Sequence, residues 1–421
     1  MVRERNYLNL LIWIEYGVHT GEMKKAKNEF VSNLIGLGSV NVLNLIIPII
    51  TMPILSRALG GDGYGIVLLF SSVTIFMMII VDYSVNINGV RDVALNPNSL
   101  ESIYIRFQGV RCLFGMVYFP LAVLYCYYNI SEINFNNIVE LLFVSIIGYY
   151  FMAPWFHQGT GTLIFFSGVS TVLRLLQILL IIIFVKDRAD LLYALRINAY
   201  VFLVNGVLLY LYRKFKFDFS FSIINPFKLK EIKNGFGNFI GDFSPNLYSN
   251  LPPLILGGLV SSNIFASYSL ALRLINVAGS FQSIICRSMY PIAAKRKINV
   301  NAFLLINIVL SLVPIIFILT SSDFLIEWFL GNGFDEAALF LKLGTLGILF
   351  YAISSSLMFA YVLPNNHDAL FRKISLFSSI VPAIVGYPLI YLFGALGAIS
   401  MFIFARFCFA ILYLFNYLKL K

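Results

Sequence analysis

The sequence predicts an all-α polytopic membrane protein of about 12 transmembrane helices, in two six-helix lobes with pseudo-two-fold symmetry. Two observations lead to this prediction. The chain is 59% hydrophobic and only 12% charged, whereas soluble proteins are about half apolar and a quarter charged. Its apolar residues also fall in long runs, and a helix needs about 20 of them to cross the hydrocarbon core.

The apolar runs follow one another with short connectors, of which 88–106 and 213–235 are the longest. No connector is long enough to fold as a separate domain. We expect the spans at residues 31–56, 64–87, 107–128, 138–157, 163–185, 190–212, 236–260, 264–293, 300–321, 337–362, 372–393 and 396–418.

The Lys and Arg residues between the spans set the expected orientation, because cytoplasmic loops are enriched in them. With a cytoplasmic N-terminus, the outer segments hold only Arg57, Lys186 and Arg188. The inner segments hold Arg3, Arg5, Lys24, Lys25, Lys27, Arg91, Arg106, Arg213, Lys214, Lys216, Lys228, Lys230, Lys233, Lys295, Arg296, Lys297, Arg372, Lys373, Lys419 and Lys421. Both termini are therefore expected in the cytoplasm, and the net charge of +10 does not indicate nucleic-acid binding.

The basic connector 213–235 divides the spans six and six. We expect a cytoplasmic N-terminal segment at 1–29, an N-lobe at 30–212, a linker at 213–235 and a C-lobe at 236–421. A shift of 204 residues places Pro48 on Pro252 and Tyr64 on Tyr268, which supports a duplication with parallel repeats. We expect no cleavable signal peptide in residues 1–29. Residues 1–22 are expected to be a dispensable extension, or one that does not belong to the natural protein, before a natural start at Met23.

Charged side chains inside the predicted spans are the main clue to function, since each costs about 2.5–3.5 kcal/mol at a helix centre. The carboxylates there are Asp82, Glu140 and Asp242. The cations outnumber them, so some must meet a water-filled cavity or an anionic ligand. These cations are Arg111, Arg174, Arg196, Arg273, Arg287, Lys342 and Arg406.

Several of these charges recur with polar neighbours at steps of three and four, which places them on one helical face. Polar faces of membrane helices turn away from lipid. Four predicted spans carry such a face, and we expect these four helices to line a positively charged vestibule. The four faces are Arg273, Asn276, Ser280, Ser283 and Arg287; Ser167, Ser170, Arg174 and Gln177; Asn33, Asn41 and Asn44; and Asp242, Asn246 and Asn250.

The predicted substrate-binding residues are Arg174, Arg196, Arg273, Arg287, Asn41 and Asn276. A structural role for Arg196 stays open, as it does for Arg406. Arg111 and Lys342, near span ends, are expected to extend to the lipid headgroups.

Asp242 and Asp82 are the predicted sites for coupling to H⁺ or Na⁺, with pairing to Arg91 as the alternative for Asp82. No other cofactor is expected. The cysteines (Cys112, Cys126, Cys286, Cys408) and the scattered histidines have no metal-ligand spacing.

An ordered set of segments resembles a known family. Pro48–Gly65 (PIITMPILSRALGGDGYG), Val81–Ala94 (VDYSVNINGVRDVA) and Pro154–Gly159 (PWFHQG) are similar to the first outer turn, the second-helix exit and the Trp-Phe-x-Gln-Gly signature of bacterial polysaccharide exporters. The second half continues with Tyr268–Pro291, Gly331–Phe334 and Gly394–Ala398. Across residues 30–418 the chain resembles the O-antigen flippases (Wzx) of the multidrug/oligosaccharidyl-lipid/polysaccharide (MOP) superfamily, although Ser84 stands where the family usually has glycine.

The resemblance implies a MATE-like fold of two six-helix lobes that open alternately to each side of the bacterial inner membrane. It implies a substrate of oligosaccharide repeat units linked by pyrophosphate to a polyprenyl lipid, which is moved to the periplasmic leaflet. Membrane lipids, a polysaccharide polymerase and a chain-length regulator are the partners to consider.

Two other functions stay open at this point. A membrane-embedded polysaccharide polymerase or glycosyltransferase would need a sizeable outer loop with catalytic groups, and only 322–336 holds carboxylates there. A small-molecule or cation antiporter of the same superfamily would favour acidic residues in its cavity, whereas this chain has a cationic excess.

Overall fold

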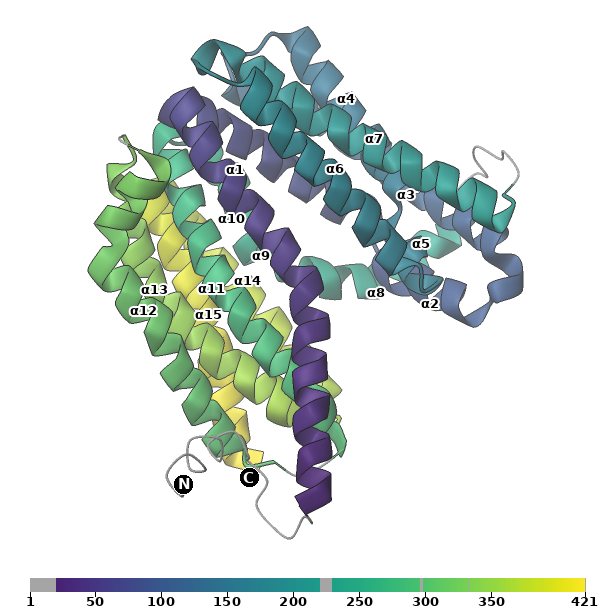
Figure 1. Ribbon diagram of the computed structural model, residues 1–421, viewed down its shortest axis with the longest axis vertical. Coiled ribbons are helices and arrows are strands. Elements are labelled where there is room, and N and C mark those ends of the chain that lie inside the picture. The colour runs from purple at the N-terminus through teal and green to yellow at the C-terminus, as the bar shows by residue number, and fades with distance from the viewer. Residues whose placement is uncertain (1–19, 220–228, 296–297, 332, 421) are drawn as a thin grey trace. The chain divides into compact units, whose positions relative to one another are not determined.

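The computed structural model describes residues 20–219, 229–295, 298–331 and 333–420, with side chains from Ile50 onward except at residues 229–230, 291, 294–295, 329–330 and 335. Every regular element in this part of the chain is a helix (Figure 1). The helices are α1 (Thr20–Asp82), α2 (Val85–Leu95), η2 (Pro97–Ser99), α3 (Leu100–Asn129), α4 (Phe135–Met152), α5 (Pro154–Gly159), α6 (Leu163–Phe184), η3 (Arg188–Asp190), α7 (Leu191–Phe217), α8 (Leu229–Phe243), α9 (Asn246–Ser249), α10 (Leu251–Gly257), α11 (Ser262–Lys295), α12 (Val300–Leu330), α13 (Asp335–Leu357), η4 (Met358–Val362), α14 (Asp368–Phe393) and α15 (Ala395–Leu420).

Within the described residues, 10 helical segments are long and apolar enough to cross a membrane. Each coincides with one of the predicted spans, so the all-α polytopic fold class is confirmed. The first predicted span, 31–56, lies in α1, where side chains are described only from Ile50. The predicted span 236–260 is the other one not counted, because it is interrupted.

Helix α1 contains the first predicted span and most of the second, joined at a kink. Gly60 has φ +69° and ψ 179° there, a backbone conformation that residues with a Cβ rarely adopt. The predicted outer turn therefore falls at Gly60, and α1 continues to Asp82. Tyr83, at φ +45°, then separates α1 from α2.

The seventh predicted span is broken into α8, α9 and α10. Pro245 precedes α9, and Pro252 lies in the first turn of α10. Proline lacks the N–H that would continue a helix, so the chain changes direction at these points. Tyr83 holds α8 in place by donating a hydrogen bond from its hydroxyl to the carbonyl of Ile232 at 3.0 Å.

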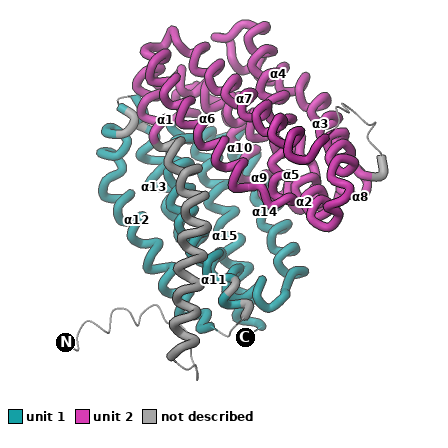
Figure 2. Tube along the Cα trace, turned by 45° about the vertical axis from the view of Figure 1, so that its right-hand side comes forward, with its two compact units in different colours: residues 1–48, 267–421 teal, residues 49–266 magenta. Residues whose placement is uncertain are grey.

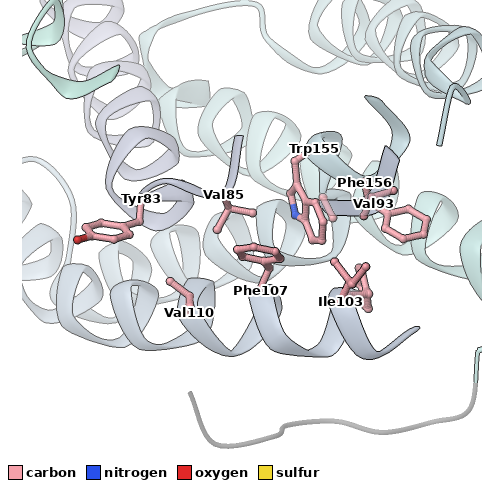
Figure 3. Packing of buried hydrophobic residues seen from close by; sticks show 10 residues of the cluster. Tyr83, Val85, Val93, Ile103, Phe107, Val110, Trp155 and Phe156 are labelled. Carbon is pink, nitrogen blue, oxygen red and sulfur yellow. The ribbon is translucent and has the colours of Figure 1, made fainter. Parts of the chain in front are cut away.

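A second break separates α4 from α5 at Ala153, which has φ +39° and precedes Pro154. Beyond it, Trp155 and Phe156 are fully buried in an aromatic core shared with α2 and α3. Figure 3 shows Trp155 beside Phe107, with their ring centroids 5.6 Å apart. This core fixes the position of α5 after the break.

The described chain forms two compact units (Figure 2). Unit 1 contains α1 as far as Pro48 and the described residues from Ser267 onward, and unit 2 runs from Ile49 to Ala266. Within unit 1, α13 packs against α12 and α15, and α14 packs against α15. The six-and-six division of the spans at the linker 213–235 stays a prediction.

Helices α4 and α7 pack closely in unit 2 because both carry glycine where they meet. A Cβ on Gly206 would lie 2.1 Å from the carbonyl oxygen of Gly148, and a Cβ on Gly148 would lie 2.8 Å from backbone atoms of Leu203. Small residues allow such backbone contact between membrane helices.

We therefore expect Gly206→Ala to destabilise the protein by at least about 1–3 kcal/mol, the usual cost of overpacking. The measurement is the thermal unfolding of the purified protein in detergent. Gly168→Ala on α6 is the matched control, because a Cβ there meets nothing within 4 Å. Equal stability of the two variants would show that α4 and α7 can separate without cost.

Candidate functional site

Asp82 is paired with Arg111 inside unit 2. Arg111 donates from Nε to Asp82 Oδ1 at 2.9 Å, and Tyr149 donates from its hydroxyl to Asp82 Oδ2. The predicted headgroup contact of Arg111 is wrong, since its side chain is 0% exposed. The alternative pairing of Asp82 with Arg91 is also wrong. The turn at Tyr83 carries α2 away, and Arg91 lies 3.5 Å from Asp92 with 64% of its side chain exposed.

Two buried arginines satisfy the carbonyls at the end of α4. The last four carbonyls of a helix lack intrahelical donors, and in α4 they belong to residues 149–152. Arg111 donates to the carbonyls of Tyr149 and Tyr150, both at 2.9 Å. Arg213 donates to the carbonyl of Met152 at 2.9 Å and to that of Phe151. The break before Pro154 thus depends on these two guanidinium groups.

Arg213 was assigned above to an inner loop, but it is 0% exposed. Its Nη1 lies 2.9 Å from His157 Nε2. Because a guanidinium only donates, Nε2 must accept, and the imidazole proton is on Nδ1. Nδ1 lies 2.9 Å from Thr162 Oγ1, to which it donates. His157 is therefore a neutral structural residue that holds α5 to the start of α6.

The remaining polar groups of α6 and α7 are partly occupied with one another. Ser170 bonds to Asn205 at 3.1 Å, and Gln177 bonds to Asn198. Arg174, on the same face of α6, is exposed. Two of the four predicted polar residues on this face therefore contact α7.

Arg196 forms a two-point ion pair with Glu140. Its Nη2 and Nε lie 2.7 and 3.1 Å from the two carboxylate oxygens, and Tyr200 adds a hydrogen bond at 3.0 Å. The side chains of Arg196 and Glu140 are 38% and 28% exposed. Arg196 thus already has a counter-charge, while its predicted contact with substrate stays a prediction.

The interrupted span α8–α10 carries the predicted ion-coupling residue. Asp242 is exposed near the end of α8. Asn246 donates to the Asp242 carbonyl at 2.9 Å, and Asn250 donates to the Asn246 side chain at 2.6 Å. Within the described part of the chain, the Asp242 carboxylate makes no ion pair.

The polar face of α11 lies in unit 1. Asn276 and Arg287 are exposed and Arg273 is half-buried. Among the described residues, neither arginine has an ion-pair partner, and Cζ of Arg287 lies 5.8 Å from the ring centroid of Phe359. These are therefore the described guanidinium groups best suited to a ligand.

Two other basic groups within the predicted spans of unit 1, Lys342 and Arg406, have partners. Lys342 Nζ lies 2.7 Å from Asp323 Oδ2. Arg406, for which the sequence left both roles open, donates to Asn276 Oδ1 at 3.0 Å and to the Gly347 carbonyl at 3.2 Å. The side chain of Asn41 lies outside the part of the chain whose side chains are described.

Comparisons with known proteins agree with the resemblance seen in the motifs. The sequence model of the family described as "Polysaccharide biosynthesis protein" matches residues 30–297. A protein of Escherichia coli (strain K12) described as "Putative O-antigen transporter" is 23% identical over 87% of this chain and 91% of its own length. A protein of Shigella dysenteriae with the same description is 21% identical over 89% of this chain and 96% of its own length.

Solved transporter structures share the fold. The lipid II flippase MurJ in an inward closed conformation matches with a TM-score of 0.69 and 14% identity, over 91% of this chain and 87% of its own. An inward-facing MATE multidrug transporter of the MOP superfamily matches with a TM-score of 0.63 and 13% identity, over 90% of this chain and 94% of its own. The predicted family resemblance, the MATE-like fold and a transporter rather than an enzyme are confirmed.

We expect Arg111→Leu to unfold at a lower temperature than the wild type. Asp82 would be left buried without its counter-charge and two carbonyls of α4 would lose a donor, and breaking a buried pair costs about 3–5 kcal/mol. Thermal unfolding in detergent measures the loss. Arg188→Leu is the control, because its pairs with Asp62 and Glu132 are exposed and such pairs contribute little. A wild-type melting temperature for Arg111→Leu would contradict the assigned role.

Proposed function

We propose a function for this chain, which belongs to the polysaccharide biosynthesis protein family: it moves polyprenyl-pyrophosphate-linked oligosaccharide units from the cytoplasmic to the periplasmic leaflet of the bacterial inner membrane. The chain is a multi-pass membrane protein with the fold of MOP-superfamily transporters. The two relatives that are described as putative O-antigen transporters align with this chain over most of their length. This similarity supports a lipid-linked glycan as the cargo.

The observation that carries the proposal is the polar face of α11. Arg273 and Arg287 lie within a membrane-spanning helix and have no carboxylate partner among the described residues. A charge in hydrocarbon needs a partner or water. Guanidinium groups match phosphate oxygens in geometry and charge, so a diphosphate headgroup is a fitting ligand.

The physics of the task is consistent with this assignment. Moving a diphosphate and sugars across about 30 Å of hydrocarbon is prohibitive without a polar path. The polyprenyl tail can stay in the bilayer if the path opens sideways. In a cell with a negative interior, outward movement of the headgroup is favoured by about 2.3 kcal/mol per charge per 100 mV. Alternating access of the two lobes would supply the path.

The rival antiporter function shares this fold, so the fold does not distinguish the two. The α11 face supports the flippase function, since it presents cations, which suit an anionic cargo rather than a cationic drug. In our proposal Asn41, Asn276, Arg174 and Arg196 also belong to the path. Both termini are cytoplasmic, and a polymerase and a chain-length regulator are candidate partners that would receive the units.

In a strain of the native host that lacks this gene, lipid-linked units should accumulate on the inner leaflet, and the wild-type gene should restore surface polysaccharide. Arg273→Gln and Arg287→Gln should each reduce export at least about tenfold, as expected for loss of a charged contact, with normal protein levels in the membrane. Lys342→Gln removes the same charge from unit 1 and should export normally. Full export by both arginine variants would exclude them from the path.

Coupling to an ion gradient is assigned to Asp242, because its carboxylate is exposed on a polar face of an interrupted span, a typical place for ion sites in transporters. Asp242→Asn should remove the dependence of export on a proton or sodium gradient in membrane vesicles. Asp323→Asn, which changes a carboxylate paired with Lys342, should keep that dependence. An Asp242→Asn variant whose ion dependence is unchanged would show that the coupling site lies elsewhere.

A further inference from the structure

Asn276 is the polar side chain next to Arg273 on the α11 face, and it accepts a hydrogen bond from Arg406 of α15. Nη2 of Arg406 donates to Asn276 Oδ1 at 3.0 Å. Asn276 itself is exposed, three residues after Arg273 and eleven before Arg287. The contact joins residues 130 positions apart in the chain, so it depends on the packing of α15 against the rest of unit 1.

Arg406 is enclosed by three helices. Its guanidinium carbon lies 4.2 Å from the ring centroid of Phe402 and 4.8 Å from that of Tyr351. The guanidinium lies against α11, since a Cβ on Gly279 would be at ordinary contact distance, 3.8 Å, from both of its terminal nitrogens. Arg406 is only 8% exposed. A bulky ligand on the α11 face would therefore contact Asn276 rather than Arg406.

The bond from Arg406 fixes which end of the Asn276 amide faces outward. A guanidinium has five N–H donors and no acceptor, so only the amide oxygen can face it. The amide nitrogen is then directed away from Arg406. In the part of the chain that the structure describes, this nitrogen donates to no acceptor. Between Arg273 and Arg287, the face thus offers one more pair of N–H donors.

A purely structural arginine in this protein looks different. Arg111 and Arg213 direct their terminal nitrogens at main-chain carbonyls and at side chains that are themselves buried. Arg406 directs one terminal nitrogen at the main-chain carbonyl of Gly347 and the other at the side chain of Asn276, which is exposed. The arrangement orients an amide on the surface of α11, where it is accessible to a ligand.

We propose that Arg406 is a positioning residue that holds the Asn276 amide with its N–H donors toward the cargo, where they bind an acceptor oxygen of the lipid-linked saccharide. This inference rests on the proposed function. The acceptor belongs to the diphosphate or to a sugar hydroxyl, and both offer the same chemistry. Specificity for acceptor oxygens follows, because the face then presents N–H donors at three positions along α11, namely Arg273, Asn276 and Arg287.

Asn276→Asp separates this role from a structural one. The new carboxylate keeps, and strengthens, the bond to Arg406, but it turns an anionic oxygen toward the cargo. We expect export to fall about tenfold or more while thermal stability is kept or raised. Asn416→Asp is the control: it adds the same charge on α15, where the side chain of Asn416 bonds, among the described residues, to the carbonyl of Leu412 at 2.8 Å, and should export normally.

A double-mutant cycle tests whether Arg406 acts through Asn276. Arg406→Gln should reduce export about tenfold in the wild type and less than about twofold in an Asn276→Ala background, since coupled residues are non-additive. Binding of polyprenyl pyrophosphate without sugar to the purified variants assigns the acceptor: weakened binding indicates the diphosphate, and unchanged binding indicates a sugar hydroxyl.

Full export by Asn276→Asp, or additive effects in the cycle, would overturn the positioning role and leave the proposed function intact. Failure of the wild-type gene to restore export would instead refute the proposed function.

Discussion

The constraint on which this structure depends is that a guanidinium group within a bilayer must have acceptors. Each unpaired arginine at a helix centre costs about 2.5–3.5 kcal/mol or more. Arg111 and Arg213 meet this constraint through the carbonyls at the end of α4. Those carbonyls face the opposite problem, because a helix end in hydrocarbon needs donors. The guanidinium groups supply the donors that the carbonyls need, and the carbonyls supply the acceptors that the guanidinium groups need. The buried arginines and the break after α4 therefore stabilise one another.

The motif at residues 154–159 gains a physical explanation from this pairing. Pro154 ends α4, Trp155 and Phe156 anchor α5 in the aromatic core, and His157 accepts from Arg213. Each residue type serves a separate purpose: the proline creates free carbonyls, the aromatic rings fix the chain beyond the break, and the imidazole holds the arginine that bonds to those carbonyls. The motif is therefore a structural element of unit 2 rather than a cargo site.

The spans could be predicted because about 20 apolar residues in a row suffice to define one. The interruption of the predicted span 236–260 could also be predicted, because the sequence has prolines at Pro245, Pro252 and Pro253. The partners of the charged side chains could not be predicted. Arg111 finds Asp82 only because the chain turns at Tyr83, and Arg406 finds Asn276 across 130 residues. Helical periodicity gives the face of a residue, but not the helix that it meets.

The structure divides the intramembrane arginines into those with protein acceptors and those left for a ligand, and the second group is small. Arg273 and Arg287 are separated by 14 residues, or about 21 Å along a helix at 1.5 Å per residue. A diphosphate spans only a few ångströms, so it cannot bind both at once. Under the proposed function these two residues act one after the other along about two thirds of the hydrocarbon thickness. Asn276 and the serines between them then bridge the gap with uncharged groups, which hold the headgroup weakly enough for it to move on.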